Sequence, residues 1–246
     1  MDNAAYVALS RQMTLRRELD ITANNIANMN TTGFKLEALE IHTETARPAR
    51  NDQVRGPVNF VLDHQVNRDF RPGNLKQTGN PLDLALDGEG AFFEVETPQG
   101  PRYTRAGSFT VSPTGVLVTA QGHPVKGEGG AEITLNPQQG EPTVSADGIV
   151  SQQGQRVGRI GIQRFANLSV LTKDGDTLFA NPTNIQPVAA NDARIRQGFL
   201  EESNVNPVVE ITKLIEINRA YESLAKIISN TEDLSRRSVE RLGRVN

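Results

Sequence analysis

The stretch Asn206–Thr231, NPVVEITKLIEINRAYESLAKIISNT, decides how the ends of this chain fold. Asn206 followed by Pro207 is typical of a helix start, because asparagine caps the free N–H groups and proline suits the first helical position. Beyond it, side chains that can pack recur at alternating spacings of three and four, which is a heptad seam. The seam positions are Leu214, Ile217, Tyr221, Leu224, Ile228 and Thr231. The pattern predicts a long helix that reaches about Leu242 and needs a partner along one side.

The opposite end of the chain is also predicted to be helical. An apolar stripe at three-to-four spacing runs through it, although Gln12 and Thr22 interrupt it. The stripe includes Ala5, Ala8, Leu15, Leu19, Ile26 and Met29. Because this stripe is too weak to stand alone, we expect the two terminal helices to pack together as a coiled-coil bundle, or against other chains.

The first helix is expected to end near Gly33. Glycine readily adopts the left-handed backbone that follows many helices. Its neighbours Thr31, Thr32 and Phe34 would turn the chain away from the helix axis.

Short strands and tight turns alternate between the two helices. From Pro81 to about Pro187, apolar runs are separated by turn pairs such as Asp87-Gly88 and Gln121-Gly122. The predicted strands cover residues 82–86, 92–95, 103–104, 109–111 and 116–119, and the pattern continues over residues 149–165. No strand–helix–strand rhythm occurs, so this middle part should be an antiparallel sandwich or barrel and the whole chain α+β.

Three parts are therefore expected along the chain. Residues 1–35 and 206–246 would form a helical domain, and residues 81–187 a β-domain inserted into it. Residues 36–80 and 188–205 would form an extended connector. The first connector segment is polar and carries three prolines, with one short strand expected at residues 58–62.

Composition excludes several classes of protein. Of the 246 residues only 37% are hydrophobic and 5% aromatic, which is a thin supply for one large core. The net charge of −3 gives no basic field for nucleic acid, and the lack of cysteine excludes disulfides and thiol chemistry. The sequence contains no run of 18 consecutive apolar residues, so no transmembrane helix is expected. No secretory signal peptide is evident, so we expect any export to use a route without a cleaved leader.

Catalytic and metal-binding motifs are not recognisable. His42, His64 and His123 lie in separate segments without ligand-like spacing. Neither a phosphate-binding glycine loop nor a nucleophile motif occurs. The sequence thus predicts no enzyme, no metal and no cofactor.

Asparagines crowd the end of the first helix in an unusual way. Asn24, Asn25 and Asn28 lie inside the periodic segment, although asparagine is a mediocre helix former. One interpretation is a fraying helix end rich in turn-forming residues. The other is that these amides hydrogen-bond between tightly packed helices and fix their register.

Four stretches carry a resemblance to a known family. ANNIANMNTTGFK (Ala23–Lys35) and QGFLEESNVNPVVEITKLIEINRAYE (Gln197–Glu222) resemble the N- and C-terminal signatures of bacterial flagellar rod and hook proteins. GNPLDLALDGEGAFFEV (Gly79–Val95) and YTRAGSFTVSPTGVLVTAQGHPV (Tyr103–Val125) look like the middle of the same axial family. The opening MDNAAYVALSRQ and the chain length most resemble proximal rod members.

This resemblance implies a structural subunit of the proximal rod, the drive shaft that carries motor torque to the hook. The terminal helices would form an inner coiled-coil layer, with the β-domain outside. Subunits would stack helically on copies of themselves and on neighbouring rod proteins across the periplasm. They would leave through the flagellar type III export apparatus, with ends that order only on assembly.

Residue roles follow from the same resemblance. Helix packing between subunits would involve Ala8, Leu15, Leu19, Ile26, Leu214, Ile217, Tyr221, Leu224 and Ile228. Register between subunits would involve Asn24, Asn25 and Asn28. Two alternatives stay open: a distal rod or hook subunit of the same family, or a soluble β-domain enzyme or binding module with a helical oligomerisation stalk.

Overall fold

The computed structural model describes residues 2–46, 58–175, 177–183 and 185–242. The chain divides into two compact units, each built from separate stretches of sequence. We call Met1–Ala27, Glu37–Asn67 and Asn206–Asn246 the terminal unit. We call Asn28–Leu36 and Arg68–Val205 the β-unit.

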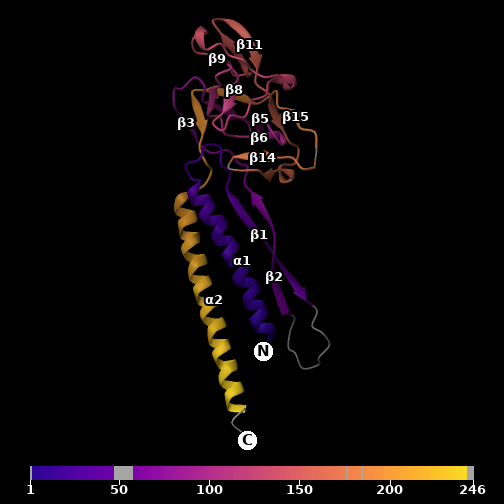
Figure 1. Cartoon of the computed structure of the whole chain (residues 1–246), viewed down its shortest axis with the longest axis vertical. Coiled ribbons are helices and arrows are strands. Elements are labelled where there is room, and N and C mark those ends of the chain that lie inside the picture. The colour runs from indigo at the N-terminus through magenta and orange to yellow at the C-terminus, as the bar shows by residue number, and fades with distance from the viewer. Residues whose placement is uncertain (1, 47–57, 176, 184, 243–246) are drawn as a thin grey trace. The chain divides into compact units, whose positions relative to one another are not determined.

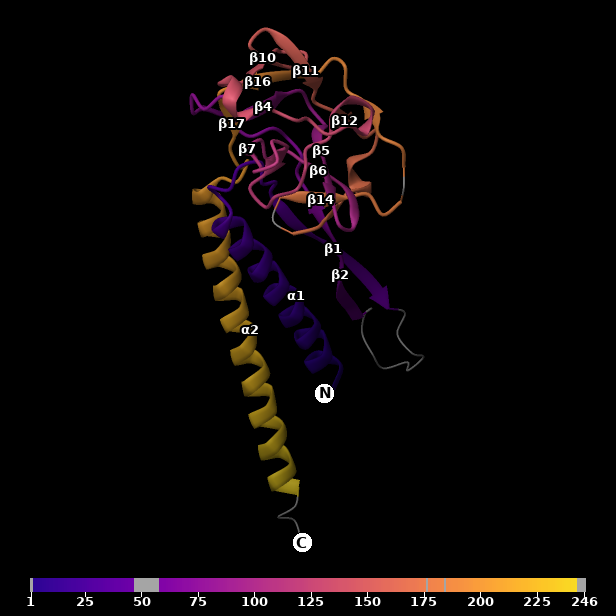
Figure 2. The same ribbon diagram turned by 45° about the horizontal axis from the view of Figure 1, so that its top comes forward.

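Two helices and one pair of strands make up the described part of the terminal unit. Helix α1 (Asp2–Ala27) and helix α2 (Pro207–Leu242) lie side by side and run in opposite directions (Figures 1 and 2). Strands β1 (Glu37–Ala46) and β2 (Val58–Arg68) pair with each other as a two-stranded sheet.

The heptad seam of α2 is the less exposed side of that helix. Ile217 is buried, and the remaining seam positions 214, 221, 224, 228 and 231 are half-buried. Over residues 7–27 of α1, the buried positions are Thr14, Leu15, Thr22 and Asn25. Polar side chains thus take up much of the buried stripe of α1, which explains why its apolar pattern is interrupted.

The β-unit contains fifteen short strands among the described residues. They are β3 (Leu75–Gln77), β4 (Leu84–Asp87), β5 (Ala91–Thr97), β6 (Gly100–Thr104), β7 (Phe109–Val111), β8 (Leu117–Thr119), β9 (Thr143–Val144), β10 (Ile149–Gln152), β11 (Gln155–Arg159), β12 (Ile162–Arg164), β13 (Thr172–Lys173), β14 (Leu178–Ala180), β15 (Val188–Ala189), β16 (Arg194–Gln197) and β17 (Phe199–Glu201). Three single 3₁₀ turns, η1 (Glu128–Gly130), η2 (Pro137–Gln139) and η3 (Leu168–Val170), connect some of them.

The largest sheet has six strands in the order β13-β14-β6-β5-β12-β15. Its central strand β5 sets Phe93 opposite Thr104 of β6 and Ile162 of β12, both in antiparallel register. A three-stranded sheet β11-β10-β9 and the pairs β16-β4, β17-β3 and β7-β8 complete the unit. The antiparallel arrangement expected from the turn spacing is therefore present.

Two hydrophobic clusters fill the β-unit. The larger is mostly aliphatic and includes Phe93, Phe109 and Ile195. The smaller is aromatic and gathers Phe92, Tyr103, Phe165, Leu171 and Phe179. Its rings meet edge to face, for example Tyr103 and Phe165 with centroids 4.7 Å apart. Aromatic residues thus contribute to both clusters and dominate the smaller one.

The compact units divide the chain differently from the sequence-based expectation. The stretch over 36–80 is not an extended connector, because β1 and β2 pair and β3 joins β17. The short strand expected at residues 58–62 is part of the longer β2. Residues 188–205 likewise carry β15, β16 and β17, which pair with β12, β4 and β3. Two of the three prolines, Pro48 and Pro57, lie outside the described residues.

A second difference concerns the end of the first helix. α1 ends at Ala27, and residues 28–36 belong to the β-unit rather than to a helical domain over 1–35. The reason is packing: Phe34 and Lys35 are buried within the β-unit, so the turn segment folds with it.

Candidate functional site

Asn25 forms a buried polar junction in the terminal unit. Its Oδ1 accepts the N–H of Glu37 at 3.0 Å, and its Nδ2 donates to the Glu37 carbonyl at 2.8 Å. The same Nδ2 donates to Oε2 of Glu210 at 3.0 Å. One amide thereby joins α1, the start of β1 and the first turn of α2. A carboxylate also suits that first turn, because it faces the positive end of the helix dipole.

The neighbouring asparagines also find partners within the chain. Asn24 Nδ2 donates to Oε2 of Glu37 at 3.2 Å. Asn28 Oδ1 accepts the hydroxyl of Thr31 at 3.1 Å, and its carbonyl accepts the Thr31 N–H. The Asn25–Glu210 bond runs from α1 to α2, which is the kind of contact that the second interpretation describes. Asn24 joins α1 to β1 instead, and Asn28 makes a local turn.

Gly33 meets the β-unit backbone where no side chain would fit. Its φ of +70° lies in the left-handed region, and its N–H donates to the Glu201 carbonyl at 2.8 Å. A Cβ added at Gly33 would lie 2.3 Å from the nitrogen of Ala106. Phe34 is buried beside it, with Lys173 Nζ 4.8 Å from the ring centroid.

Thr31 and Thr32 line a cavity of about 310 Å³ in the β-unit. Hydroxyl and amide side chains surround it, among them Asn28, Thr104 and Gln121. None of the described residues that line it is ionisable.

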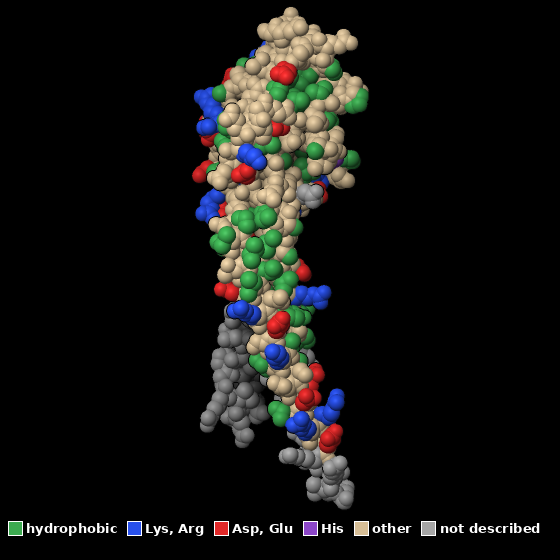
Figure 3. All heavy atoms as spheres, turned by 90° about the vertical axis from the view of Figure 1, so that its left-hand side faces the viewer, with side chains coloured by type: hydrophobic (Ala, Val, Ile, Leu, Met, Phe, Trp, Pro, Cys, Tyr) green, Lys and Arg blue, Asp and Glu red, His purple; other side chains and the backbone are tan. Residues whose placement is uncertain are grey.

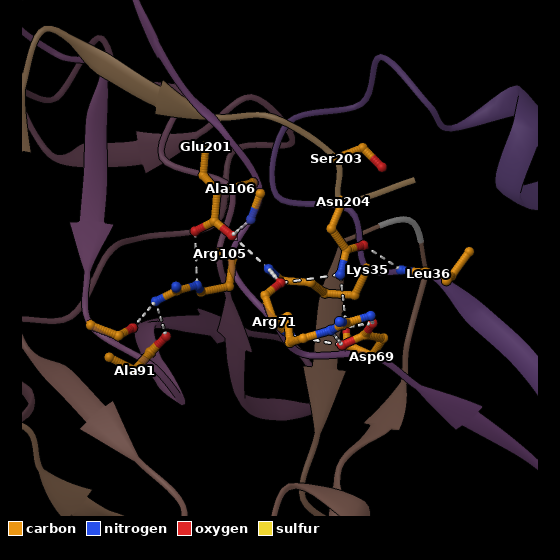
Figure 4. Close-up of polar contacts among 12 residues, drawn as sticks. Lys35, Leu36, Asp69, Arg71, Ala91, Arg105, Ala106, Glu201, Ser203 and Asn204 are labelled. Atoms are coloured by element: carbon orange, nitrogen blue, oxygen red, sulfur yellow. Dashed lines mark hydrogen bonds and ion pairs between the residues drawn. The ribbon is translucent and has the colours of Figure 1, made fainter. Parts of the chain in front are cut away.

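A buried ion triad lies within the β-unit (Figure 4). Lys35 Nζ is 2.5 Å from Glu201 Oε1, and Arg105 Nε is 2.9 Å from Glu201 Oε2. The side chains of Lys35 and Arg105 are each 1% exposed, and that of Glu201 is 0% exposed. Gly73 adds a backbone N–H to Oε1 at 3.1 Å. The triad is sealed from solvent, so its role is structural.

The triad contains two cationic side chains and only one carboxylate. Burial lowers the pKa of Lys35 from its ordinary value, and the attraction of Glu201 opposes this. Burial likewise lowers the pKa of Arg105 against the same opposing charge. Backbone carbonyls share the excess charge: Lys35 Nζ donates to Arg71 at 2.8 Å, and Arg105 Nη1 donates to Ala91 at 2.7 Å.

Sequence reasoning missed this triad. Each member lies inside one of the quoted signatures, GFK, YTRAG and FLEE, yet nothing local pairs them. The available signal was a charged residue inside each of three otherwise apolar or turn-forming motifs. Charges in such surroundings are rarely buried unless paired.

Asn206 caps the start of α2. Its Oδ1 accepts the N–H of Val208 at 3.1 Å and of Val209 at 3.4 Å. Pro207 is the first helical residue, where its missing N–H has no consequence.

An apolar face on α2 remains uncovered. Val208, Ile211 and Ile215 follow one another at three and four positions and are 73%, 46% and 47% exposed. Figure 3 faces this helix and shows apolar side chains along its first half. Further exposed apolar side chains are Val209, Ile227 and Leu234 on α2, and Leu9 and Met13 on α1. Contiguous exposed apolar surface of this kind marks interaction sites.

Within the described ranges, no cluster of histidine and acidic side chains could hold a metal ion. In the same ranges, neither terminal helix has the length and hydropathy needed to cross a membrane.

Three family descriptions match successive parts of the chain. "Flagella basal body rod protein" matches residues 6–35 and "Flagellar hook protein FlgE/F/G D1 domain" matches residues 85–152. "Flagellar basal body rod FlgEFG protein C-terminal" matches residues 196–241. These matches include both helices and the first half of the β-unit.

Curated relatives extend the similarity over the full length. Flagellar basal-body rod protein FlgF of Caulobacter vibrioides is 58% identical over 100% of both chains. FlgF of Mesorhizobium japonicum is 38% identical over 99% of both chains. FlgG of Bacillus subtilis is 31% identical over 95% of this chain and 97% of its own. The resemblance read from the sequence is confirmed, and the chain belongs to the family of flagellar basal-body rod proteins.

Proposed function

We propose that this chain is a structural, non-enzymatic subunit of the proximal part of the flagellar basal-body rod. The observation that carries the proposal is the uncovered apolar face of α2 in a chain of this family. A polymer subunit needs such a face, because neighbouring subunits must bury it. Identity to the FlgF relatives, 58% and 38%, favours this assignment over a distal rod protein of the FlgG type, whose relatives are 31% to 34% identical.

The two helices form the assembly surface of the proposed subunit. α1 and α2 pack through Leu15 and the seam around Ile217 as a coiled coil, and the face of Val208, Ile211 and Ile215 packs against the next subunit. Complete burial of each large aliphatic side chain contributes about 1.5–3 kcal/mol, so a few contacts per subunit give a stable polymer. Partners are copies of this chain and neighbouring rod proteins, stacked through heterologous contacts that do not close a ring.

The remaining sequence-based roles stay part of this proposal. Ala8, Leu19 and Ile26 of α1, with Tyr221, Leu224 and Ile228 of α2, contribute further packing. Asn24, Asn25 and Asn28 contribute to register between subunits, beside the hydrogen bonds that they make within the subunit. The subunit passes through the flagellar type III export apparatus and takes its place in the rod across the periplasm.

Electron microscopy of basal bodies from a strain lacking this chain tests the proposal. A rod that is absent or stops at the inner-membrane ring supports an early axial position. A complete rod and hook would refute it and would favour a soluble stalked module.

A matched pair of variants tests the assembly surface. Ile211→Leu keeps the apolar face, whereas Ile211→Asp places a charge in it. Complementation by the leucine variant, with failure of a folded and exported aspartate variant to enter basal bodies, is expected. Equal incorporation of both variants would contradict the proposed face.

A further inference from the structure

The chain passes between the terminal unit and the β-unit four times. The crossings follow Ala27, Leu36, Asn67 and Val205. On the β-unit side, the residues next to three of these crossings are Leu36, Arg68 and Val205, which are far apart in sequence. Their relative placement needs a cause within the β-unit.

The side chain of Asn204 connects these segments (Figure 4). Its Oδ1 accepts the N–H of Leu36 at 2.8 Å. Its Nδ2 donates to the carbonyl of Asp69 at 2.8 Å and to that of Arg71 at 3.1 Å. Asn204 thus uses its acceptor and both its donors on the backbones of two other segments. It stands one residue before the last crossing.

A second set of contacts repeats the same connections. The N–H of Asp69 donates to the Leu36 carbonyl at 2.9 Å. Lys35 Nζ donates to the Arg71 carbonyl, and the Glu201 carboxylate receives both Lys35 and the Gly73 N–H. Three of the four crossings are therefore tied to one another by a main-chain hydrogen bond, an amide and an ion triad.

Backbone segments beside the Glu201 contacts also approach so closely at Gly33 and Gly73 that a residue with a side chain would not fit. A Cβ at Gly73 would lie 1.9 Å from the carbonyl oxygen of Glu202, and Gly33 is similarly enclosed. Because both close approaches occur at glycines on the segments that Glu201 holds, the sequence and the hydrogen bonds specify the same arrangement.

We propose that Asn204 is a positioning residue that clamps three chain crossings into one arrangement within the single subunit. The clamp consists of Asn204, the Lys35–Glu201 pair and the Leu36–Asp69 hydrogen bond. It makes residues 28–36 part of the β-unit fold, so the paths of the chain out of this unit are set before any subunit assembles. The inference goes beyond the rod assignment, because it concerns the isolated chain.

Hydrogen exchange of the full-length soluble protein tests the clamp without a variant. Peptides covering residues 28–36 should be protected to the same degree as β5 peptides, because both belong to one folded unit. Rapid exchange of residues 28–36 beside a protected β5 would overturn the proposal. Failure of the rod assignment would instead appear in the basal bodies, so the two outcomes are distinguishable.

Substitutions of Asn204 then test the residue itself. Asn204→Ala removes all three hydrogen bonds, and exchange in residues 28–36 and 68–73 should accelerate about 10-fold or more, with β5 unchanged. Asn204→Asp keeps the acceptor for Leu36 but loses both donors, so residues 68–73 should loosen more than residues 28–36. The matched control is Asn167→Ala, which removes a cap at η3 in the same unit.

Two results would contradict the role of Asn204. If Asn204→Ala exchanged at the wild-type rate in residues 28–36 and in residues 68–73, the Asn204 side chain would not position either segment. If Asn204→Asp accelerated hydrogen exchange equally throughout the β-unit, Asn204 would stabilise the unit in general and would not hold particular segments.

Discussion

Lys35 Nζ lies 2.5 Å from Glu201 Oε1, although 166 positions separate the two residues in sequence. The same carboxylate also serves Arg105, so it must balance two buried cations. Arg105 Nη2 finds no hydrogen-bond partner within the described part of the chain. The members of the triad are therefore not equivalent, and their removal should have unequal effects.

Replacement of Glu201 by glutamine should be severe. Glu201→Gln keeps the shape but leaves two buried cations without a counter-charge, which costs about 3–5 kcal/mol. Urea unfolding of the full-length protein, followed by circular dichroism, measures the change in the free energy of unfolding. Lys35→Met is the matched comparison, because it leaves one cation facing one carboxylate. A larger loss in Lys35→Met than in Glu201→Gln would argue against an excess of positive charge.

Stability should rise with pH on the alkaline side. Burial holds the pKa of Lys35 below its ordinary value of 10.5, so between the folded-state pKa and 10.5 the unfolded chain binds more protons. The free energy of unfolding should therefore increase as pH rises through that window. Urea unfolding at several pH values measures the slope. In Lys35→Met the free energy of unfolding should no longer rise with pH in this window. An unchanged slope in that variant would mean that another group causes the rise.

Two glycines separate backbone strain from steric clash. Gly33 and Gly79 have similar φ values of +70° and +76°, but a Cβ at Gly79 would meet nothing within 4 Å. Gly79→Ala should thus cost only the left-handed strain, about 1–2 kcal/mol. Gly33→Ala should cost clearly more, since its Cβ would overlap the Ala106 backbone. Thermal unfolding of both variants measures the loss of stability. Equal losses would show that the close approach at Gly33 does not contribute to the cost.

Gly33→Val should abolish swimming for the same reason. The β-branched side chain adds bulk where no Cβ fits, so the subunit should fail to assemble. Soft-agar motility of a complemented deletion strain is the measurement. Normal swimming would mean that the turn at Gly33 tolerates a different path.

The role of the heptad seam in assembly can be tested by placing an aspartate either in the seam or next to it. Leu224→Asp puts a carboxylate in the half-buried seam, whereas Ser223→Asp puts it on the exposed neighbouring position. We expect the Leu224→Asp subunit to be exported but missing from purified basal bodies, while Ser223→Asp is incorporated. Immunoblots of both fractions report the distribution. Leu224→Asp in intact rods would show that the seam does not carry assembly.

Local signals in the sequence predicted local structure well. α2 runs from Pro207 to Leu242 as expected, because the cap and the heptad pattern both act over a few residues. The strand at residues 109–111 was likewise predicted with its observed bounds. Of β1 and β2, only residues 58–62 were expected as a strand, and their pairing was missed because it is not written in either strand alone.

The candidate site was only partly predictable for a related reason. Asn25 attracted attention as an unusual helix residue, but its partners Glu37 and Glu210 come from other elements. Lys35, Arg105 and Glu201 are ordinary charges in the sequence, and only the fold brings them together. Periodicity reports which face of an element is buried, but it does not report which distant charge lies there.

The long separation between Lys35 and Glu201 has a consequence for the timing of folding. During synthesis, Lys35 emerges early, and its counter-charge emerges only when most of the chain is complete. Contacts of such high sequence separation also require a large loop-closure entropy to be overcome first, which slows folding. The Lys35–Glu201 contact can therefore form only after most of the chain has been synthesised.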